Sequence, residues 1–223
     1  MSSTSFYETM DIMRDAEIHM LVGGAICLDF VNTLNGHRDG PLGAPRHEYL
    51  LDYRDLVLWS RHSGILTQDQ AGLLLAQASQ RPGEAQLVLD RVITLRETLY
   101  RIFKSIAGGL RPEQADLDTL DQTRLEILVQ SRLVPLLNGF RIEWQDEQGS
   151  LDRMLAPLVL SAVDLLTSNE LGRLRECDGE VCDWLFVDKS RNHLRRWCSM
   201  DHCGNRAKSR RQYARRKGLS AGA

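Results

Sequence analysis

The chain has 223 residues, of which 43% are hydrophobic and 26% charged, as in an ordinary globular protein. This composition excludes a chain dominated by disorder. No apolar run approaches the about 20 residues that a membrane helix needs, and the polar first 18 residues lack the pattern of a signal peptide. We therefore expect a cytoplasmic protein with no membrane partner.

The net charge of −2 conceals two parts of opposite charge. Residues 1–170 carry 15 Lys and Arg against 24 Asp and Glu, a balance of −9, whereas residues 171–223 carry 13 against 6, a balance of +7. Within residues 189–217, 11 basic side chains accompany a single acid, Asp201. An acidic body joined to a basic end predicts two modules, of which the second binds a polyanion. The alternative is a solvated basic tail.

Residues 1–18 are interpreted as a short N-terminal extension. Residues 23–34 form an apolar stretch that also contains polar side chains. The start of this stretch is expected to be a buried strand or the entry to a helix, with Cys27 as a core cysteine. Asp29, Asn32 and Thr33 have two interpretations. They either cap the chain and hydrogen-bond locally, or they line a pocket for a small-molecule effector.

The apolar spacing then predicts a mainly helical body over residues 19–170. Helices are expected over residues 51–61, 67–78, 84–106, 112–129 and 150–166. Thr67 and Ser150 are the expected N-caps of the second and fifth helices, Pro82 ends the second, and Gly108-Gly109 ends the third. In the fourth helix the side chains expected to face inward are Leu117, Leu120, Leu125 and Leu128.

A β-hairpin is expected between the fourth and fifth helices. Residues 133–137 and 140–144 flank the pair Asn138-Gly139. A type I′ turn favours this pair, because both central residues of that turn take positive φ.

Four of the five cysteines lie within the basic end, with the spacing C-x4-C-x15-C-x4-C. They are Cys177, Cys182, Cys198 and Cys203. Two close pairs of cysteines in a reducing compartment predict a tetrahedral thiolate site, for which Zn²⁺ is the favoured metal. An iron–sulfur cluster and unligated or redox-active thiols are the alternatives. His202 could replace one cysteine, but four thiolates already complete the site.

The residues around the cysteines predict a small treble-clef-like zinc finger over residues 171–223, which a linker over residues 168–176 joins to the body. Residues 184–187 and 194–198 are expected to be two short strands, and residues 205–217 a basic helix with Cys203 at its N-terminus. Ala207 and Ala214 are candidates for the packed side of this helix. The fold class is therefore mainly α: a helical N-terminal domain with a β-hairpin, followed by the finger.

The basic helix has the dimensions to enter the major groove of double-stranded DNA, where arginines contact phosphates or guanine edges. For Asn205, capping of the helix is the alternative to contact with adenine. The candidate nucleic-acid contacts are Arg195, Arg196, Asn205, Arg206, Lys208, Arg210 and Arg211.

The sequence CGNR at residues 203–206, with WLF at 184–186 and RRWCSM at 195–200, resembles the CGNR zinc-finger family. LDFVNTL at residues 28–34 resembles the opening of the ABATE domain, which precedes this finger in such proteins. The resemblance implies a stress-induced transcription regulator and implies no activity for the body.

The favoured interpretation is a one-component regulator, in which the helical body senses a signal or forms a homodimer and the zinc finger binds DNA. An RNA- or ribosome-associated zinc module and a protein-interaction adaptor are the alternatives. We do not expect an enzyme, because the chain carries no GxSxG, HExxH, P-loop or Rossmann motif.

Overall fold

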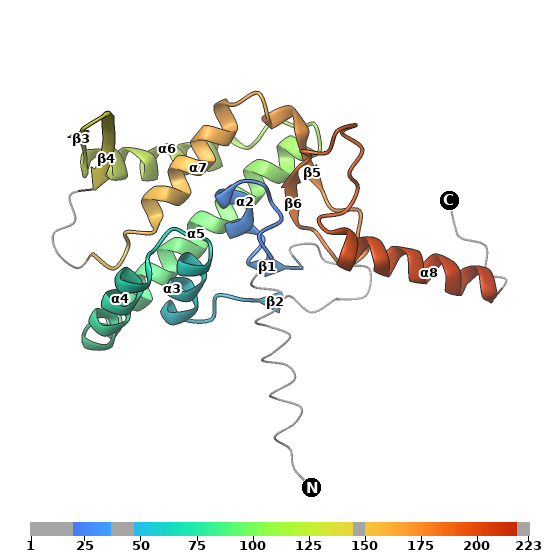
Figure 1. The fold of residues 1–223 in the computed structure, drawn as a ribbon, viewed down its shortest axis with the longest axis horizontal. Helices are drawn as coiled ribbons and strands as arrows, with labels where there is room; N and C mark the ends of the chain where they lie inside the picture. The colour runs from blue at the N-terminus through green and yellow to red at the C-terminus, as the bar shows by residue number, and fades with distance from the viewer. Residues whose placement is uncertain (1–19, 37–46, 145–149, 218–223) are drawn as a thin grey trace, which may run out of the picture.

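The computed structural model describes residues 20–36, 47–144 and 150–217 (Figure 1). The predicted N-terminal extension, residues 1–18, lies outside the described residues. The body contains the helices α2 (Ile26–Val31), α3 (Tyr53–His62), α4 (Gln68–Gln80), α5 (Pro82–Ala107), α6 (Gln114–Val129) and α7 (Leu155–Thr167). These helices confirm the mainly α fold. None of the helices in the described part of the chain is both long and apolar enough to cross a membrane.

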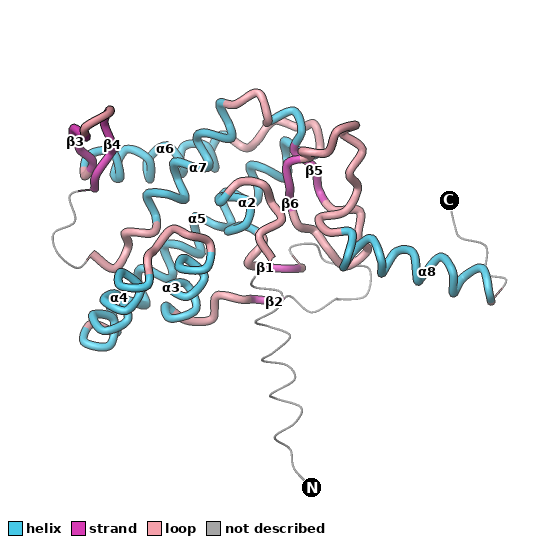
Figure 2. Tube along the Cα trace, in the orientation of Figure 1, coloured by secondary structure: helices cyan, strands magenta, loops and turns pink. Residues whose placement is uncertain are grey.

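The described strands form three antiparallel pairs. They are β1 (Leu34–Asn35) with β2 (His47–Glu48), β3 (Ser131–Leu136) with β4 (Gly139–Trp144), and β5 (Leu174–Glu176) with β6 (Leu185–Val187). The C-terminal module adds the 3₁₀ turn η1 (Leu171–Arg173), the π-helical turn η2 (Met200–Gly204) and helix α8 (Asn205–Arg216). Figure 2 shows that loops make up most of the module between β6 and η2.

Local sequence signals mark several helix starts. The Thr67 hydroxyl accepts a hydrogen bond from the Gln70 N–H, and the Gln70 side chain bonds back to the Thr67 N–H, so a capping box starts α4 as predicted. Pro82 occupies the first turn of α5, where its missing N–H costs nothing. The predicted cap at Ser150 is wrong. Its hydroxyl bonds to the Asp152 carboxylate in a preceding turn, and α7 begins at Leu155.

Helix α5 is the centre of the body. It packs against α2, α3, α4 and α6, and near its C-terminal end against β5 and β6 (Figure 1). Its apolar spacing predicts one buried face from Val88 to Ile106. The middle of this face, from Val92 to Phe103, is buried, whereas Val88 and Ile106 are half-buried. In α6 the inward face differs from the prediction. Leu120 and Ile127 are buried seven residues apart, whereas Leu125 and Leu128 lie off that stripe and are 55% and 38% exposed.

The β3–β4 hairpin is confirmed, but its turn is displaced by one residue. Leu136 pairs with Gly139, which leaves Leu137 and Asn138 as the loop. Gly139 has a φ of 145°, which glycine adopts readily, and it becomes the first residue of β4. Among the described non-glycine residues only His193 has positive φ, so Asn138 does not form the predicted type I′ turn.

The strand pairing of the finger also differs from the prediction. Residues 194–198, all described, form no strand, and β6 pairs instead with β5 in the predicted linker. The 194–198 segment makes other contacts: the Arg195 N–H donates to the buried Asp188 carboxylate, and the Arg196 carbonyl accepts from the Asp178 N–H. Backbone groups used in this way are not available for a ladder with β6.

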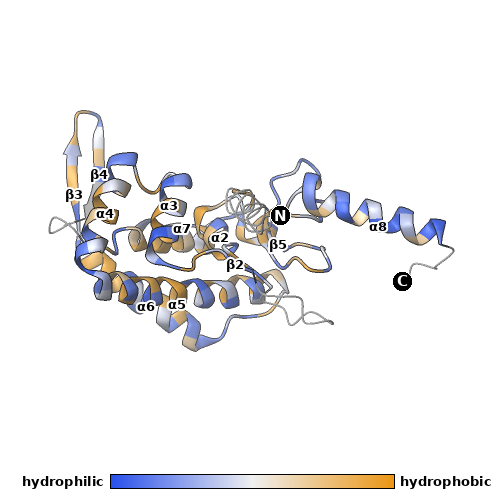
Figure 3. Cartoon of the chain, turned by 90° about the horizontal axis from the view of Figure 1, so that it is seen from below, coloured by the Kyte–Doolittle hydropathy of each residue, from blue (hydrophilic) through white to orange (hydrophobic). Residues whose placement is uncertain are grey.

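The finger and the body share one hydrophobic core. Leu174, Leu185 and Val187 from β5 and β6 are buried in the same cluster as the body helices. The Val187 N–H donates to the Gly23 carbonyl at 2.8 Å. In contrast, α8 extends away from the body, and Figure 3 shows that it is predominantly hydrophilic along its length.

Candidate metal centre and nucleic-acid interface

The four finger cysteines form one buried cluster, with all four sulfur atoms within 4.8 Å of one another. Cys198 Sγ lies 3.7 Å from Cys182 Sγ and 3.6 Å from Cys203 Sγ, and all four cysteines are free. Tetrahedral zinc with Zn–S bonds of about 2.3 Å places its sulfurs about 3.8 Å apart. These two sulfur–sulfur distances therefore match a zinc tetrahedron, and the remaining ones lie within 4.8 Å.

The four cysteines come from the turn between β5 and β6, from the loop after β6, which carries Cys198, and from η2. Cys177 follows β5 and Cys182 precedes β6, so both lie on the turn between these strands, whereas Cys203 lies in η2 at the start of α8. A Cβ atom on Gly179 would lie 2.9 Å from Cys182 Cβ and 3.4 Å from Cys203 Sγ. Only glycine at this position leaves room for the sulfur cluster.

Hydrogen bonds among the four thiols distribute their protons unequally. These bonds lower the pKa of Cys177 and raise the pKa of Cys182 and Cys198. The Cys198 N–H, which donates to Cys177 Sγ at 3.3 Å, also stabilises the Cys177 thiolate. His202 is exposed and does not belong to the cluster of potential metal ligands, which among the described residues consists of the four cysteines. Cys27 is separate and buried in the body, and burial raises its pKa to about 12. This agrees with its prediction as a core cysteine.

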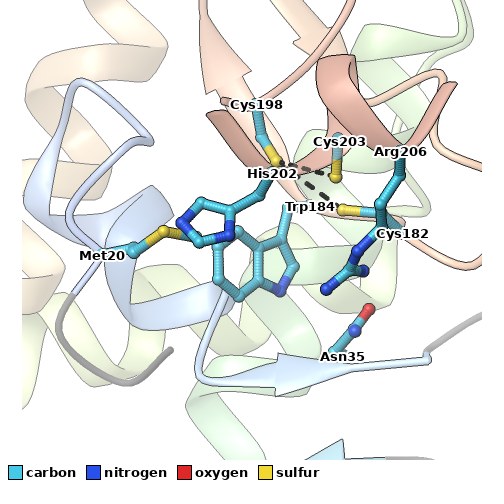
Figure 4. A pocket seen from close by; sticks show the side chains of 8 residues that line it. All are labelled: Met20, Asn35, Cys182, Trp184, Cys198, His202, Cys203 and Arg206. Atoms are coloured by element: carbon cyan, nitrogen blue, oxygen red, sulfur yellow. Dashed lines mark hydrogen bonds between the residues drawn. The ribbon is translucent and has the colours of Figure 1, made fainter. Parts of the chain in front are cut away.

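A small cavity of about 20 Å³ adjoins the cluster (Figure 4). Trp184 lines it together with Met20, Asn35 and Arg206, and the Trp184 side chain is otherwise buried in the core of the finger. Trp184 Nε1 and Asn35 Oδ1 are both buried, and neither finds a hydrogen-bond partner among the described residues. A space of this size accommodates a single water molecule between two such groups.

Helix α8 begins at the metal centre and projects into solvent (Figure 1). Its 12 residues span about 18 Å at 1.5 Å per residue. In the described length of this helix Ala207 and Ala214 are half-buried and the other residues are exposed. Its exposed cations, together with the following Lys217, are Arg206, Lys208, Arg210, Arg211, Arg215 and Arg216.

Arg195 is half-buried, and its guanidinium is bound by protein groups. Its guanidinium stacks 4.3 Å from the Phe186 ring centroid and donates to the carbonyls of Trp197, Val22 and Cys198. These bonds tie Trp197 and Cys198 of the finger to Val22 at the start of the body. Contact of Arg195 with nucleic acid stays a prediction.

The remaining predicted contacts lie around α8. Arg196 and Arg210 are exposed, and each pairs with an acid of the Cys177–Cys182 turn: Arg196 with Asp178 at 2.6 Å and Arg210 with Glu180 at 3.1 Å. The Asn205 amide donates to the Asp201 carbonyl at 3.1 Å, so it stabilises the start of the helix. Arg206 lies beside the small cavity, whereas Lys208 and Arg211 are exposed on the helix.

In the body, the polar atoms of Asp29, Asn32 and Thr33 hydrogen-bond to protein groups, some nearby in the chain and some distant. Asp29 Oδ1 accepts from the Gly23 N–H at 2.7 Å, and burial, opposed by this bond and one from Val22, raises the Asp29 pKa to about 6. The Thr33 hydroxyl donates to the Phe30 carbonyl and accepts from Arg96. Their polar atoms therefore bind protein groups, and the effector pocket at these residues stays a prediction.

Asn32 makes the connection that sequence reasoning missed. Its amide donates to the Leu185 carbonyl and accepts from the Leu185 N–H, both at 2.9 Å. Asp188 was missed as well: its buried carboxylate accepts from the Ser190 N–H and hydroxyl. The spacing Asp-x-Ser is a known turn signal that could have indicated the Asp188 contacts. The contact between Asn32 and Leu185 spans 153 positions and leaves no local signal.

The fold and site together define a protein with a helical body and a zinc-binding finger. Residues 24–169 match the ABATE family, whose description is "Putative stress-induced transcription regulator", and residues 173–216 match the CGNR zinc finger. The chain belongs to the ABATE family and carries a CGNR zinc finger, with Zn²⁺ as the metal of its four-cysteine cluster. A search of curated proteins gave no match.

Proposed function

We propose that this protein is a one-component transcription regulator of the cytoplasm that binds double-stranded DNA through its zinc finger and has no catalytic activity. The observation that carries the proposal is α8, a solvent-exposed basic helix whose first turn is fixed by the metal centre. A helix with so little apolar surface gains almost nothing from packing, so its position depends on its N-terminal anchor. Zinc would therefore hold the DNA-binding element in place.

The charge of the finger suits a polyanion even when the metal is counted. Four thiolates and one Zn²⁺ contribute −2, against 11 basic residues and one acid over residues 189–217. Lys208, Arg211 and Arg215 recur at spacings of three and four, so they share one face of α8. We assign the groove-facing surface to these three residues, which we call the basic face. Arg206 and Arg210 are directed toward the cavity and toward Glu180, respectively.

The proposal also includes a homodimer formed by the body. The β3–β4 hairpin exposes the apolar side chains of Leu133, Leu136, Leu137 and Phe140. A two-stranded hairpin with such a surface is marginal alone and gains stability from a partner. Dimerisation would join two fingers on one DNA molecule and raise the affinity for paired half-sites.

The proposal is tested by selection of bound duplexes from random DNA by the full-length protein, with single-stranded RNA as competitor. The triple variant Lys208→Ala, Arg211→Ala and Arg215→Ala should lose the selected duplex. The matched control is Arg111→Ala, which removes an exposed cation of the body. An enriched duplex that the control still binds supports the proposal. Preferential retention of RNA, or equal binding by the triple variant, contradicts it.

A further inference from the structure

A second surface feature of the finger lies outside the basic face. It is a hollow of about 450 Å³ beside the loop that follows β6. Its apolar lining comes from Leu194, Trp197 and Met200, and its basic lining from Arg191, Arg195 and Arg196. Leu194 is 77% exposed and Met200 49% exposed, so neither side chain belongs to the buried core. Large apolar side chains exposed beside cations are typical of a binding surface.

The loop that forms this hollow has a fixed shape. The Asp188 carboxylate lies below it, fully buried, and accepts from the Ser190 N–H at 2.9 Å, the Ser190 hydroxyl at 2.6 Å and the Arg195 N–H at 2.9 Å. Burial raises the pKa of Asp188, but these donors outweigh it and leave the pKa below its ordinary value. The charged carboxylate thus closes the loop, so the hollow is formed before any ligand binds.

The hollow and the basic face meet at Trp197. The Arg196 guanidinium lies 5.4 Å from the centre of the Trp197 ring, and the Arg211 guanidinium of α8 lies 6.0 Å from it. The ring therefore connects the hollow to one of the three residues of the basic face. A ligand long enough to follow α8 would reach both.

The charge around the hollow selects the ligand. Residues 189–200 contain four cations and no acid. Arg191 is exposed and makes no ion pair with any described residue. Arg196 is held by Asp178 through Nε, which leaves its terminal nitrogens for a second anion. Cations at the rim and carbon at the floor suit a chain of phosphates and sugars, in which each sugar presents an apolar face between two negative groups.

We propose that the hollow holds one nucleotide of the DNA backbone beside the groove that α8 enters. Arg191 and Arg196 contact successive phosphates, and Leu194 and Met200 pack against the sugar between them. The inference rests on the proposed function, and it adds a second grip that sets the orientation of α8 on the duplex. Contacts of this kind position the protein without reading the sequence.

The test compares Arg191→Ala and Leu194→Ser with wild type and with the control Arg111→Ala. Binding of the selected duplex is followed by fluorescence anisotropy over a salt series, and backbone protection by hydroxyl-radical footprinting. Loss of one phosphate contact in Arg191→Ala should reduce the steepness of log affinity against log salt by about 1. Leu194→Ser should weaken binding about threefold to tenfold with an unchanged slope, because it removes apolar contact only. Both should lose protection at one backbone segment and keep the segment covered by α8.

Two failures of this experiment are distinguishable. If wild type binds the duplex, and both loop variants match it in affinity, slope and footprint, the second grip is wrong while the proposed function stands. If wild type binds no duplex, the proposed function itself is wrong. Circular dichroism of each variant checks that it folds; both substituted side chains are exposed, so wild-type spectra are expected.

Discussion

The contact between Asn32 and β6 should determine whether finger and body fold as one unit. On one side, β6 pairs with β5. On its other side, the Asn32 amide takes the place of a neighbouring strand, because it both donates to and accepts from the backbone of Leu185. Asn32 is 4% exposed and Leu185 0% exposed, so water cannot replace these bonds. The substitution Asn32→Ala removes both at once.

The expected loss follows from the groups left without partners. A buried N–H or carbonyl without a hydrogen bond costs about 1–3 kcal/mol, so two of them cost about 2–6 kcal/mol. This is a large fraction of the about 5–15 kcal/mol by which a domain is stable. Asn32→Asp keeps an acceptor for the Leu185 N–H but cannot donate to the Leu185 carbonyl. It should therefore also destabilise the protein.

Denaturant unfolding measures the effect, with helical circular dichroism and tryptophan fluorescence recorded together. Wild type should show one transition that coincides for both signals. Asn32→Ala should lower the free energy of unfolding by the amount above, whereas the exposed control Asn192→Ala should change it by less than about 0.5 kcal/mol. Two separate wild-type transitions, or a loss below about 0.5 kcal/mol in Asn32→Ala, would refute the reasoning.

Three further predictions concern the metal, the pH response and the hairpin. Elemental analysis should find one zinc per chain, and Cys198→Ser should lose it; wild type without stoichiometric metal contradicts the site. The folded-state pKa of Asp29 is raised to about 6, so its contribution to stability is present at low pH and is lost as pH rises through 6. Relative to Asp29→Asn, the free energy of unfolding of wild type should therefore fall by about 2 kcal/mol between pH 4.5 and 7. Free energies of unfolding that change in parallel with pH in the two proteins would contradict this prediction. In sedimentation at micromolar concentration, wild type should be a dimer, and the double variant Leu133→Ser with Phe140→Ser should be a monomer. A monomeric wild type would contradict the proposed homodimer.

Sequence patterns predict those parts of the structure that are specified locally. The capping box at Thr67, the stripe of α5 and the four-cysteine cluster each depend on residues close together in the chain or on strict chemical preference. The sequence predicts Pro82 only as the end of one helix, but Pro82 also starts the next, because its ring is tolerated in a first turn.

The parts that the sequence does not predict depend on distant or very short pairings. Strand β5 has three residues, too few for an alternating pattern, so the sequence predicts a linker there. Asn32 contacts Leu185 across 153 positions, which no local pattern reveals. The sequence cannot reveal that Arg195 stacks on Phe186, because this contact depends on the tertiary fold.

The most direct test of a zinc-held DNA-binding helix is the salt dependence of binding before and after zinc removal. Fluorescence anisotropy with the selected duplex should give log affinity falling with log salt at a slope of about −5 if five or six cations contact phosphates. Chelation of zinc should abolish this binding, and added zinc should restore it. A flat salt response, or unchanged affinity after verified zinc loss, would contradict the account.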